Sequence, residues 1–168
     1  MENKNLTAEH LRFLLNYCPE SGVFTWKNPQ ASNVKAGQVA GTDDGKGYLL
    51  IGINGKLYKA HRLAWLYVTG EWPAGQIDHI NRCKSDNRLC NLRIANGSQN
   101  QMNKFHPNNT SGVKGVYWNK QRGKWQAQIQ VHGKGYNLGR YADIRDAAEA
   151  YQAIARIIHG EFNHFGEQ

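Results

Sequence analysis

The sequence predicts an α+β protein built from two small domains. A strong hairpin signal runs directly into a short helix at residues 48–67, and three strand-like segments precede an amphipathic helix at residues 114–159. The 168 residues suffice for one ordinary domain or two small ones, but not for a large catalytic fold around an internal cofactor. We therefore expect domains at residues 1–105 and 113–168, joined by a linker at 106–112.

The first domain is expected to open with a short helix. Thr7 can cap this helix, in which Leu11, Leu14 and Leu15 form an apolar stripe. A strand is expected at residues 22–26, and the Gly-, Asp- and Asn-rich stretch after it predicts loop.

The hairpin is expected at residues 48–60. Its strands flank Asn54-Gly55, a dipeptide that readily adopts the positive φ angles of a tight turn. A helix is expected at 61–67, closing near Gly70.

A second pair of strands is expected further along the first domain. Short apolar segments at 77–80 and 92–95 flank a polar loop, and Ser98 can cap a helix through Lys104. The predicted order is therefore strand, loop, strand, helix.

The second domain follows a run of chain-breaking residues. Strands are expected at 114–119, 124–131 and 135–141, with Gly133-Lys134 inside one turn. A helix with regularly spaced apolar residues is expected at 143–159. This pattern predicts a three-stranded antiparallel sheet packed on one helix.

Composition limits the partners that the chain can have. The formal net charge is +8, the balance expected of a protein that binds polyanions. No apolar run is long enough to span a membrane, and the first residues lack a signal pattern, so we expect a cytoplasmic protein. Cys18, Cys83 and Cys90 are odd in number and lack Cys-x-x-Cys spacing, so we expect free thiols packed as small hydrophobes and no structural zinc.

Asp78 and His79 are the residues that first indicate chemistry. A carboxylate can bind a divalent cation, and a neutral imidazole can take a proton from water, as metal-assisted phosphodiester hydrolysis requires. An isolated Asp-His pair is a weak signal, because such pairs are common on protein surfaces. The surrounding string is more specific: Ile77-Asp78-His79-Ile80-Asn81, Asp86-Asn87-Arg88, Asn91-Leu92-Arg93 and Asn100-x-x-Asn103.

This string resembles the HNH homing endonucleases of phage genomes, and the likeness runs from about Tyr17 to Asn103. The resemblance implies the ββα-metal fold, in which two strands and a helix present the site. It also implies that Asp78 and Asn100 are metal ligands, that His79 is the general base, and that Asn91 ties the loop to the hairpin. Such an oxygen-rich site suits one Mg²⁺ or Mn²⁺ ion.

The remaining residues of the likeness have less certain roles. The resemblance favours a structural or phosphate-contacting role for His61, and turn chemistry favours loop architecture for Asp86 and Asn87. Arg82-Cys83 and Gly97 depart from the family pattern, but neither departure removes a catalytic group.

The segment 124–131 alternates strictly between apolar and polar residues. One face is expected to be core, whereas Lys124, Gln126, Gln128 and Gln130 share the other. Glutamine amides in line can reach base edges in a major groove, although a solvated strand would explain the same pattern.

Residues 112–165 resemble the plant ethylene-response-factor DNA-binding domain. The likeness is carried by Gly115-Val116-Tyr117-Trp118, Gly123-Lys124-Trp125, Leu138-Gly139-x-Tyr141, Ala147-Ala148-x-Ala150-Tyr151 and His159-Gly160-x-Phe162-Asn163. It implies that the polar face meets the major groove of DNA. Trp118 and Trp125 are expected in the core rather than as platforms on which bases stack. Base-edge candidates are Tyr117, Asn119, Gln126, Gln128, Gln130 and Asn137, and phosphate candidates are Lys114, Lys120, Arg122, Lys124, Lys134 and Arg140.

The expected function is site-specific, divalent-metal-dependent cleavage of double-stranded DNA, as a nick or a double-strand cut. We expect a monomer or weak dimer, acting in a bacterial cytoplasm if the gene belongs to a phage. Two alternatives stay open at this point: a non-catalytic sequence-specific DNA-binding protein, and RNA cleavage, which a sheet suited to the wide major groove makes less favourable.

Overall fold

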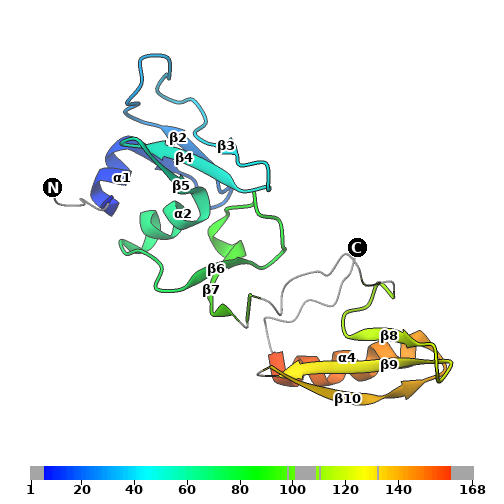
Figure 1. Cartoon of the computed structure of the whole chain (residues 1–168). Helices are drawn as coiled ribbons and strands as arrows, with labels where there is room; N and C mark the ends of the chain where they lie inside the picture. The colour runs from blue at the N-terminus through cyan, green and yellow to red at the C-terminus, as the bar shows by residue number, and fades with distance from the viewer. Residues whose placement is uncertain (1–5, 98, 101–108, 110, 132, 160–168) are drawn as a thin grey trace. The chain divides into compact units, whose positions relative to one another are not determined.

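The computed structural model describes residues 6–97, 99–100, 109, 111–131 and 133–159. The chain forms two compact units, Met1–Asn96 and Gly97–Gln168 (Figure 1). The boundary between the units thus falls before Gly97, earlier in the sequence than the linker expected at 106–112. Most of that linker and most of the helix expected at 98–104 lie outside the described residues.

The first unit opens with helix α1, Ala8–Leu14, as the sequence predicts. The Thr7 hydroxyl accepts a hydrogen bond from the backbone N–H of His10 at 3.2 Å, which satisfies a donor at the helix start. The chain then forms a small antiparallel ribbon from β1, Leu15–Tyr17, and β2, Phe24–Trp26.

The central sheet of the first unit has the order β3-β4-β5. These strands are Thr42–Asp43, Leu49–Ile53 and Lys56–Lys59. Asn54 and Gly55 adopt φ angles of 52° and 74°, and the strands pair antiparallel on either side of them. The expected tight turn is therefore confirmed.

Helix α2, Ala60–Thr69, follows β5 without a loop and ends at Gly70, whose φ of 84° closes the helix in the left-handed conformation. Strands β6, Gln76–His79, and β7, Leu92–Ala95, form a separate antiparallel pair. The loop between them ends in a single 3₁₀ turn, Leu89–Asn91.

One hydrophobic core holds the first unit together. It joins α1, the first ribbon, the central sheet and α2, and it extends to β6 and β7. Its fully buried large side chains include Leu11, Leu15, Phe24, Ile51, Ile53, Leu63 and Leu66.

The second unit is the predicted sheet packed on one helix (Figure 1). Strands β8, Val116–Asn119, β9, Lys124–Val131, and β10, Lys134–Tyr141, pair antiparallel in the order β10-β9-β8. Helix α4, Ile144–His159, packs against the sheet. The core between them consists of Val116, Ala127, Ile129, Ala147, Tyr151 and Ala155.

Two expectations about burial are wrong. Cys18, Cys83 and Cys90 are exposed thiols, because all three lie in loops or turns rather than on core-facing positions. Trp118 is 44% exposed, since β8 is an edge strand and the indole packs edge-on against Trp125, with 5.2 Å between ring centroids. In the part of the chain that the structure describes, every helix is too short or too polar to cross a bilayer.

Candidate active site

Asp78 and His79 are the last two residues of β6, where it pairs with β7. The register places Asp78 opposite Arg93 and His79 opposite Leu92. Successive strand residues point to opposite faces, so the carboxylate and the imidazole occupy the two sides of this ribbon. Both are buried, each with about 5% of its surface exposed.

Asp78 is held by a buried ion pair across the ribbon. Its Oδ2 accepts a hydrogen bond from Arg93 Nε at 2.9 Å, and Arg93 Nη2 lies 2.8 Å from the same oxygen. A buried carboxylate is costly unless it is paired and hydrogen-bonded, and Arg93 provides both compensations. Asp78 therefore has a cationic partner directly across the ribbon.

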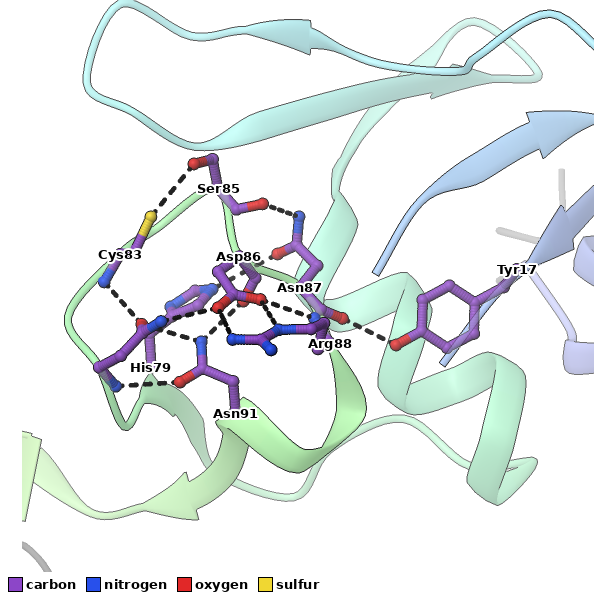
Figure 2. A network of polar contacts seen from close by, with 9 residues as sticks. Tyr17, His79, Cys83, Ser85, Asp86, Asn87, Arg88 and Asn91 are labelled. Atoms are coloured by element: carbon purple, nitrogen blue, oxygen red, sulfur yellow. Dashed lines mark hydrogen bonds and ion pairs between the residues drawn. The ribbon is translucent and has the colours of Figure 1, made fainter. Parts of the chain in front are cut away.

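Asn91 fastens the loop between β6 and β7. Its Oδ1 accepts from the backbone N–H of Asn81 at 2.9 Å, and its Nδ2 donates to Asn81 Oδ1 at 3.0 Å and to the Asp86 carbonyl at 2.8 Å. These bonds close the loop on itself (Figure 2). None of these three hydrogen bonds joins the Asn91 side chain to the imidazole of His79.

Asn87 is the loop residue that contacts the imidazole. Its Oδ1 lies 3.4 Å from His79 Nε2, and its Nδ2 donates to the carbonyl of Ser85 at 3.1 Å (Figure 2). The bond to Ser85 fixes which end of the amide faces the ring, and an amide oxygen can only accept. His79 therefore carries its proton on Nε2, which makes Nδ1 the basic nitrogen.

The backbone of Asn87 is held by a residue of β1, near the start of the first unit. Tyr17 donates from its hydroxyl to the Asn87 carbonyl at 2.7 Å, and Asn87 is only 1% exposed. Gly22 lies so close that a Cβ there would overlap the backbone of Asn87 and Arg88. The ribbon of β1 and β2 thus sets the position of the residue that contacts His79.

An aromatic cluster covers the other side of the imidazole. The rings of His61 and His79 meet edge-on with centroids 5.0 Å apart, and Tyr48 lies 5.4 Å from His61 and 6.1 Å from His79. Burial lowers the pKa of His79, although the hydrogen bond with Asn87 and the charge of Asp78 oppose the shift. Burial, reinforced by His79, lowers the pKa of His61 to about 3. Both histidines are therefore neutral at pH 7, and His79 can accept a proton.

Asn100, the other expected metal ligand, is a half-buried helical residue. It belongs to the second compact unit, whereas Asp78, His79 and Asn91 belong to the first. Three of the four expected site residues therefore lie on β6 and its loop within one unit, and the approach of Asn100 to Asp78 stays a prediction.

Most of the expected DNA-contacting residues of the second unit lie on one face of its sheet. The register pairs Tyr117 with Gln126, Gln126 with Arg140, and Gln128 with Asn137. Gln126 is nearly covered, at 8% exposed, because its Oε1 accepts from Asn119 Nδ2 at 3.0 Å and from Arg140 Nε at 3.4 Å.

The other members of this group are more open. Gln128, Gln130 and Asn137 are exposed on the same face, and Tyr117 donates to Gln128 Oε1 at 3.2 Å. Lys134 pairs with Val131, which places it on the helix side of the sheet. The other cationic candidates, of which only Lys114 is half-buried, are Lys114, Lys120, Arg122 and Lys124.

Comparison with known proteins identifies the first unit. Residues 58–102 match a family model described as HNH endonuclease. The chain is also 35% identical over 115 residues to Protein 3.8 of Escherichia phage T7, an alignment that covers 66% of this chain and 94% of that protein. The chain contains an HNH endonuclease domain.

A viral relative agrees with this assignment. The HNH chain is 30% identical over 104 residues to an uncharacterized HNH endonuclease of Acanthamoeba polyphaga mimivirus, covering 61% of this chain and 54% of that protein. The chain thus spans about half the length of this relative. No solved structure matches the chain significantly. The HNH resemblance is confirmed, whereas the likeness of residues 112–165 to a plant DNA-binding domain stays a prediction.

Sequence reasoning did not assign chemistry to several side chains of the HNH site. Its turn chemistry predicts only a role in loop architecture for Asn87, and no pattern predicts a role for Tyr48 or Arg93. The pairing of Arg93 with Asp78 could have been predicted. Two strands at 77–80 and 92–95, joined by a closed loop, place Arg93 opposite Asp78. No sequence pattern indicates that Tyr48 faces His79, since that contact depends on how two separate sheets pack.

Proposed function

We propose that this chain is a divalent-metal-dependent, site-specific DNA endonuclease of the homing type. It cleaves or nicks double-stranded DNA and leaves 5′-phosphate and 3′-hydroxyl ends. The observation that carries the proposal is the buried, neutral imidazole of His79, held by Asn87 at the end of β6 and next in sequence to Asp78, which pairs with Arg93.

In the proposed reaction His79 is the general base. Nδ1 of the imidazole takes a proton from the attacking water, while Nε2–H keeps its hydrogen bond to Asn87 and holds the ring in place. Burial lowers the pKa of His79 and so keeps the ring in the neutral form that a general base requires. Asn91 contributes indirectly, by fixing the loop that carries Asn87.

The donor groups of the chain fit a hard divalent cation. HNH nucleases typically use a divalent metal ion, and Asp78 and Asn100 are the proposed ligands here. Among the described residues no group of three or more His, Cys, Asp or Glu side chains could hold a metal, so the protein itself would supply few ligands.

One carboxylate and one amide, completed by phosphate and water oxygens, suit Mg²⁺ or Mn²⁺. Asp78 would share its carboxylate between the ion and Arg93. When bound, the ion would stabilise the negative charge that develops on the phosphate and on the leaving oxygen.

The second unit is proposed to choose the site that is cleaved. Its sheet offers an exposed polar face opposite a helix-covered core, with amides that can both donate and accept, flanked by cationic side chains. Gln128, Gln130 and Asn137 are the exposed base-edge candidates, whereas Gln126 acts by fixing Asn119 and Arg140.

The nuclease proposal is tested by incubating supercoiled DNA with the full chain and Mg²⁺ or Mn²⁺. We expect nicked or linear product, loss of activity in EDTA, and loss of activity in His79→Ala. His10→Ala, which removes a histidine on α1, is the matched control and should cleave normally. Wild-type protein that binds a DNA without cleaving it under these conditions would contradict the proposal and leave a non-catalytic DNA-binding protein. Full activity in His79→Ala would instead reject the general base.

A further inference from the structure

Two lysine side chains converge on the ring of Tyr48, beside the catalytic histidine. Lys59 Nζ lies 4.0 Å from the ring centroid and Lys84 Nζ lies 5.0 Å from it. The same ring lies 6.1 Å from the ring of His79. The packing of Tyr48 therefore gathers two positive charges at the edge of the active site.

Three separate segments create this arrangement. Lys59 ends β5 opposite Leu50, so Tyr48 is its diagonal neighbour on the same face of the hairpin. Lys84 comes from the loop after β6, and its Nζ donates to the carbonyl of Lys46 at 2.8 Å, which fastens that loop to the hairpin. The aliphatic part of the Lys84 side chain lies within 4 Å of the position that a Cβ on Gly47 would occupy.

Neither ammonium group is neutralised within the described part of the chain. Of the ion pairs found there, none involves Lys59 or Lys84. Asp44 is an acidic side chain whose pKa is affected by the charge of Lys59. Burial raises this pKa, but hydrogen bonds from the backbone and the charges of nearby lysines hold it below its ordinary value. Its Oδ1 already accepts from the backbone N–H groups of Lys46 and Tyr48.

The pair is therefore held together against its own repulsion. Contact with the aromatic face stabilises each cation, while the two like charges oppose each other. An anion placed between the two ammonium groups would relieve this repulsion. The anion that an HNH nuclease meets at this place is the phosphate backbone of its substrate.

We propose that Lys59 and Lys84, positioned by the ring of Tyr48, form a phosphate-binding subsite for the DNA strand that passes His79. This inference rests on the proposed function and adds a binding role that the motif residues do not supply. Contacts of this kind fix the register of the backbone without reading sequence. The subsite would thus present a phosphodiester to His79 whatever bases flank it.

Protection of lysines from acetylation tests the subsite without requiring cleavage. The full chain carrying His79→Ala is treated with an acetylating reagent with and without a short DNA duplex of mixed sequence. We expect DNA to protect Lys59 and Lys84, whereas Lys35, an exposed lysine elsewhere in the first unit, keeps its reactivity. Unchanged reactivity of Lys59 and Lys84 on DNA that is shown to be bound would overturn the inference.

Kinetics of single variants give an independent readout. Lys59→Met and Lys84→Met should each raise KM on the order of ten-fold with little change in kcat, and lower the slope of log KM against log salt by about one. Lys35→Met is the matched control and should change neither. A loss of kcat rather than a rise in KM in the lysine variants would overturn the subsite.

These outcomes separate the subsite from the nuclease proposal. Protection of both lysines by DNA in a protein that never cleaves would leave the subsite and reject the endonuclease. Cleavage by a protein whose lysines stay reactive would leave the endonuclease and reject the subsite.

Discussion

At the scale of single residues, Asn87 links three parts of the active site. Its amide bridges Ser85 and the imidazole of His79, and its carbonyl accepts the hydroxyl of Tyr17. A side-chain amide can accept from Nε2–H with its oxygen while its nitrogen donates to a carbonyl. Asn87 therefore sets both the orientation and the tautomer of the imidazole.

We predict that Asn87→Ala lowers kcat by about 10- to 100-fold, the usual effect of losing a group that orients a reacting side chain. KM should change little, because Asn87 is buried away from bulk solvent. Nitrogen NMR of His79 should show the Nε2–H tautomer in the wild type and a mixture in the variant. Cys90→Ala, at an exposed position in the same loop, is the control; equal loss of kcat in both variants would contradict the assignment.

His61 makes the stability of the first unit depend on pH. In the unfolded chain this histidine binds a proton near pH 6.5, whereas in the folded protein its pKa is about 3. Between these values the unfolded state binds more protons, so the free energy of unfolding falls as the pH falls. We predict a loss of about 2 kcal/mol between pH 7 and pH 5.

Urea unfolding followed through the amide signals of Ile51 and Leu63 measures this loss in the first unit alone. His61→Gln should be less stable at pH 7 and should lose most of the pH dependence in this range. A wild-type unfolding free energy that stays constant from pH 7 to pH 5 would contradict the proposed burial of neutral His61.

At the scale of elements, the ribbon of β1 and β2 supports the catalytic loop through Gly22. This glycine has a φ of 72°, and a Cβ would overlap the backbone of Asn87 and Arg88. Gly37 has a similar φ of 83° but open space around its Cα. Both positions have a positive φ that strains any residue with a side chain, but only Gly22 lies against the backbone of the loop.

We predict that Gly37→Ala costs about 1 kcal/mol of unfolding free energy, the strain of a side chain in the left-handed region. Gly22→Ala should cost about 1–3 kcal/mol more, because the overlap displaces the backbone of the loop. It should also lower kcat, since Asn87 moves with that backbone. Thermal unfolding and cleavage assays on both variants check this; equal stability losses with normal kcat would show that the ribbon does not support the loop.

The elements themselves were largely predictable, because their signals are local. Asn54-Gly55 dictates the hairpin turn, and the alternation at 124–131 gives the two faces of β9. The contacts within the site were less predictable. The approach of Asn87 to His79 depends on how a loop folds on itself, and the burial of Gln126 depends on neighbours from two other strands.

At the scale of the whole molecule, the structure separates the proposed chemistry from the proposed choice of target. Asp78 and His79 lie in the first compact unit, and the polar face of β9 lies in the second. The two functions should therefore respond independently to substitution, because sites without shared partners contribute additively.

We predict that the double variant Gln128→Ala, Gln130→Ala changes which sequences are enriched in binding-site selection but leaves the metal requirement and the 5′-phosphate ends unchanged. His79→Ala should do the reverse, abolishing cleavage while enriching the same sequences as the wild type. Each exposed amide that contacts a base is expected to contribute about 1–3 kcal/mol of discrimination.

The selection is best run with the full chain in EDTA, so that bound DNA stays intact. Glu149→Ala, an exposed residue on α4, is the matched control, because the sheet packs against this helix and the glutamines lie on the opposite face. Identical enriched sequences in the wild type and the glutamine double variant would mean that β9 does not read bases. Direct readout would then have to come from the remaining base-edge candidates on the neighbouring strands, such as Tyr117 and Asn137, because phosphate contacts carry no sequence information.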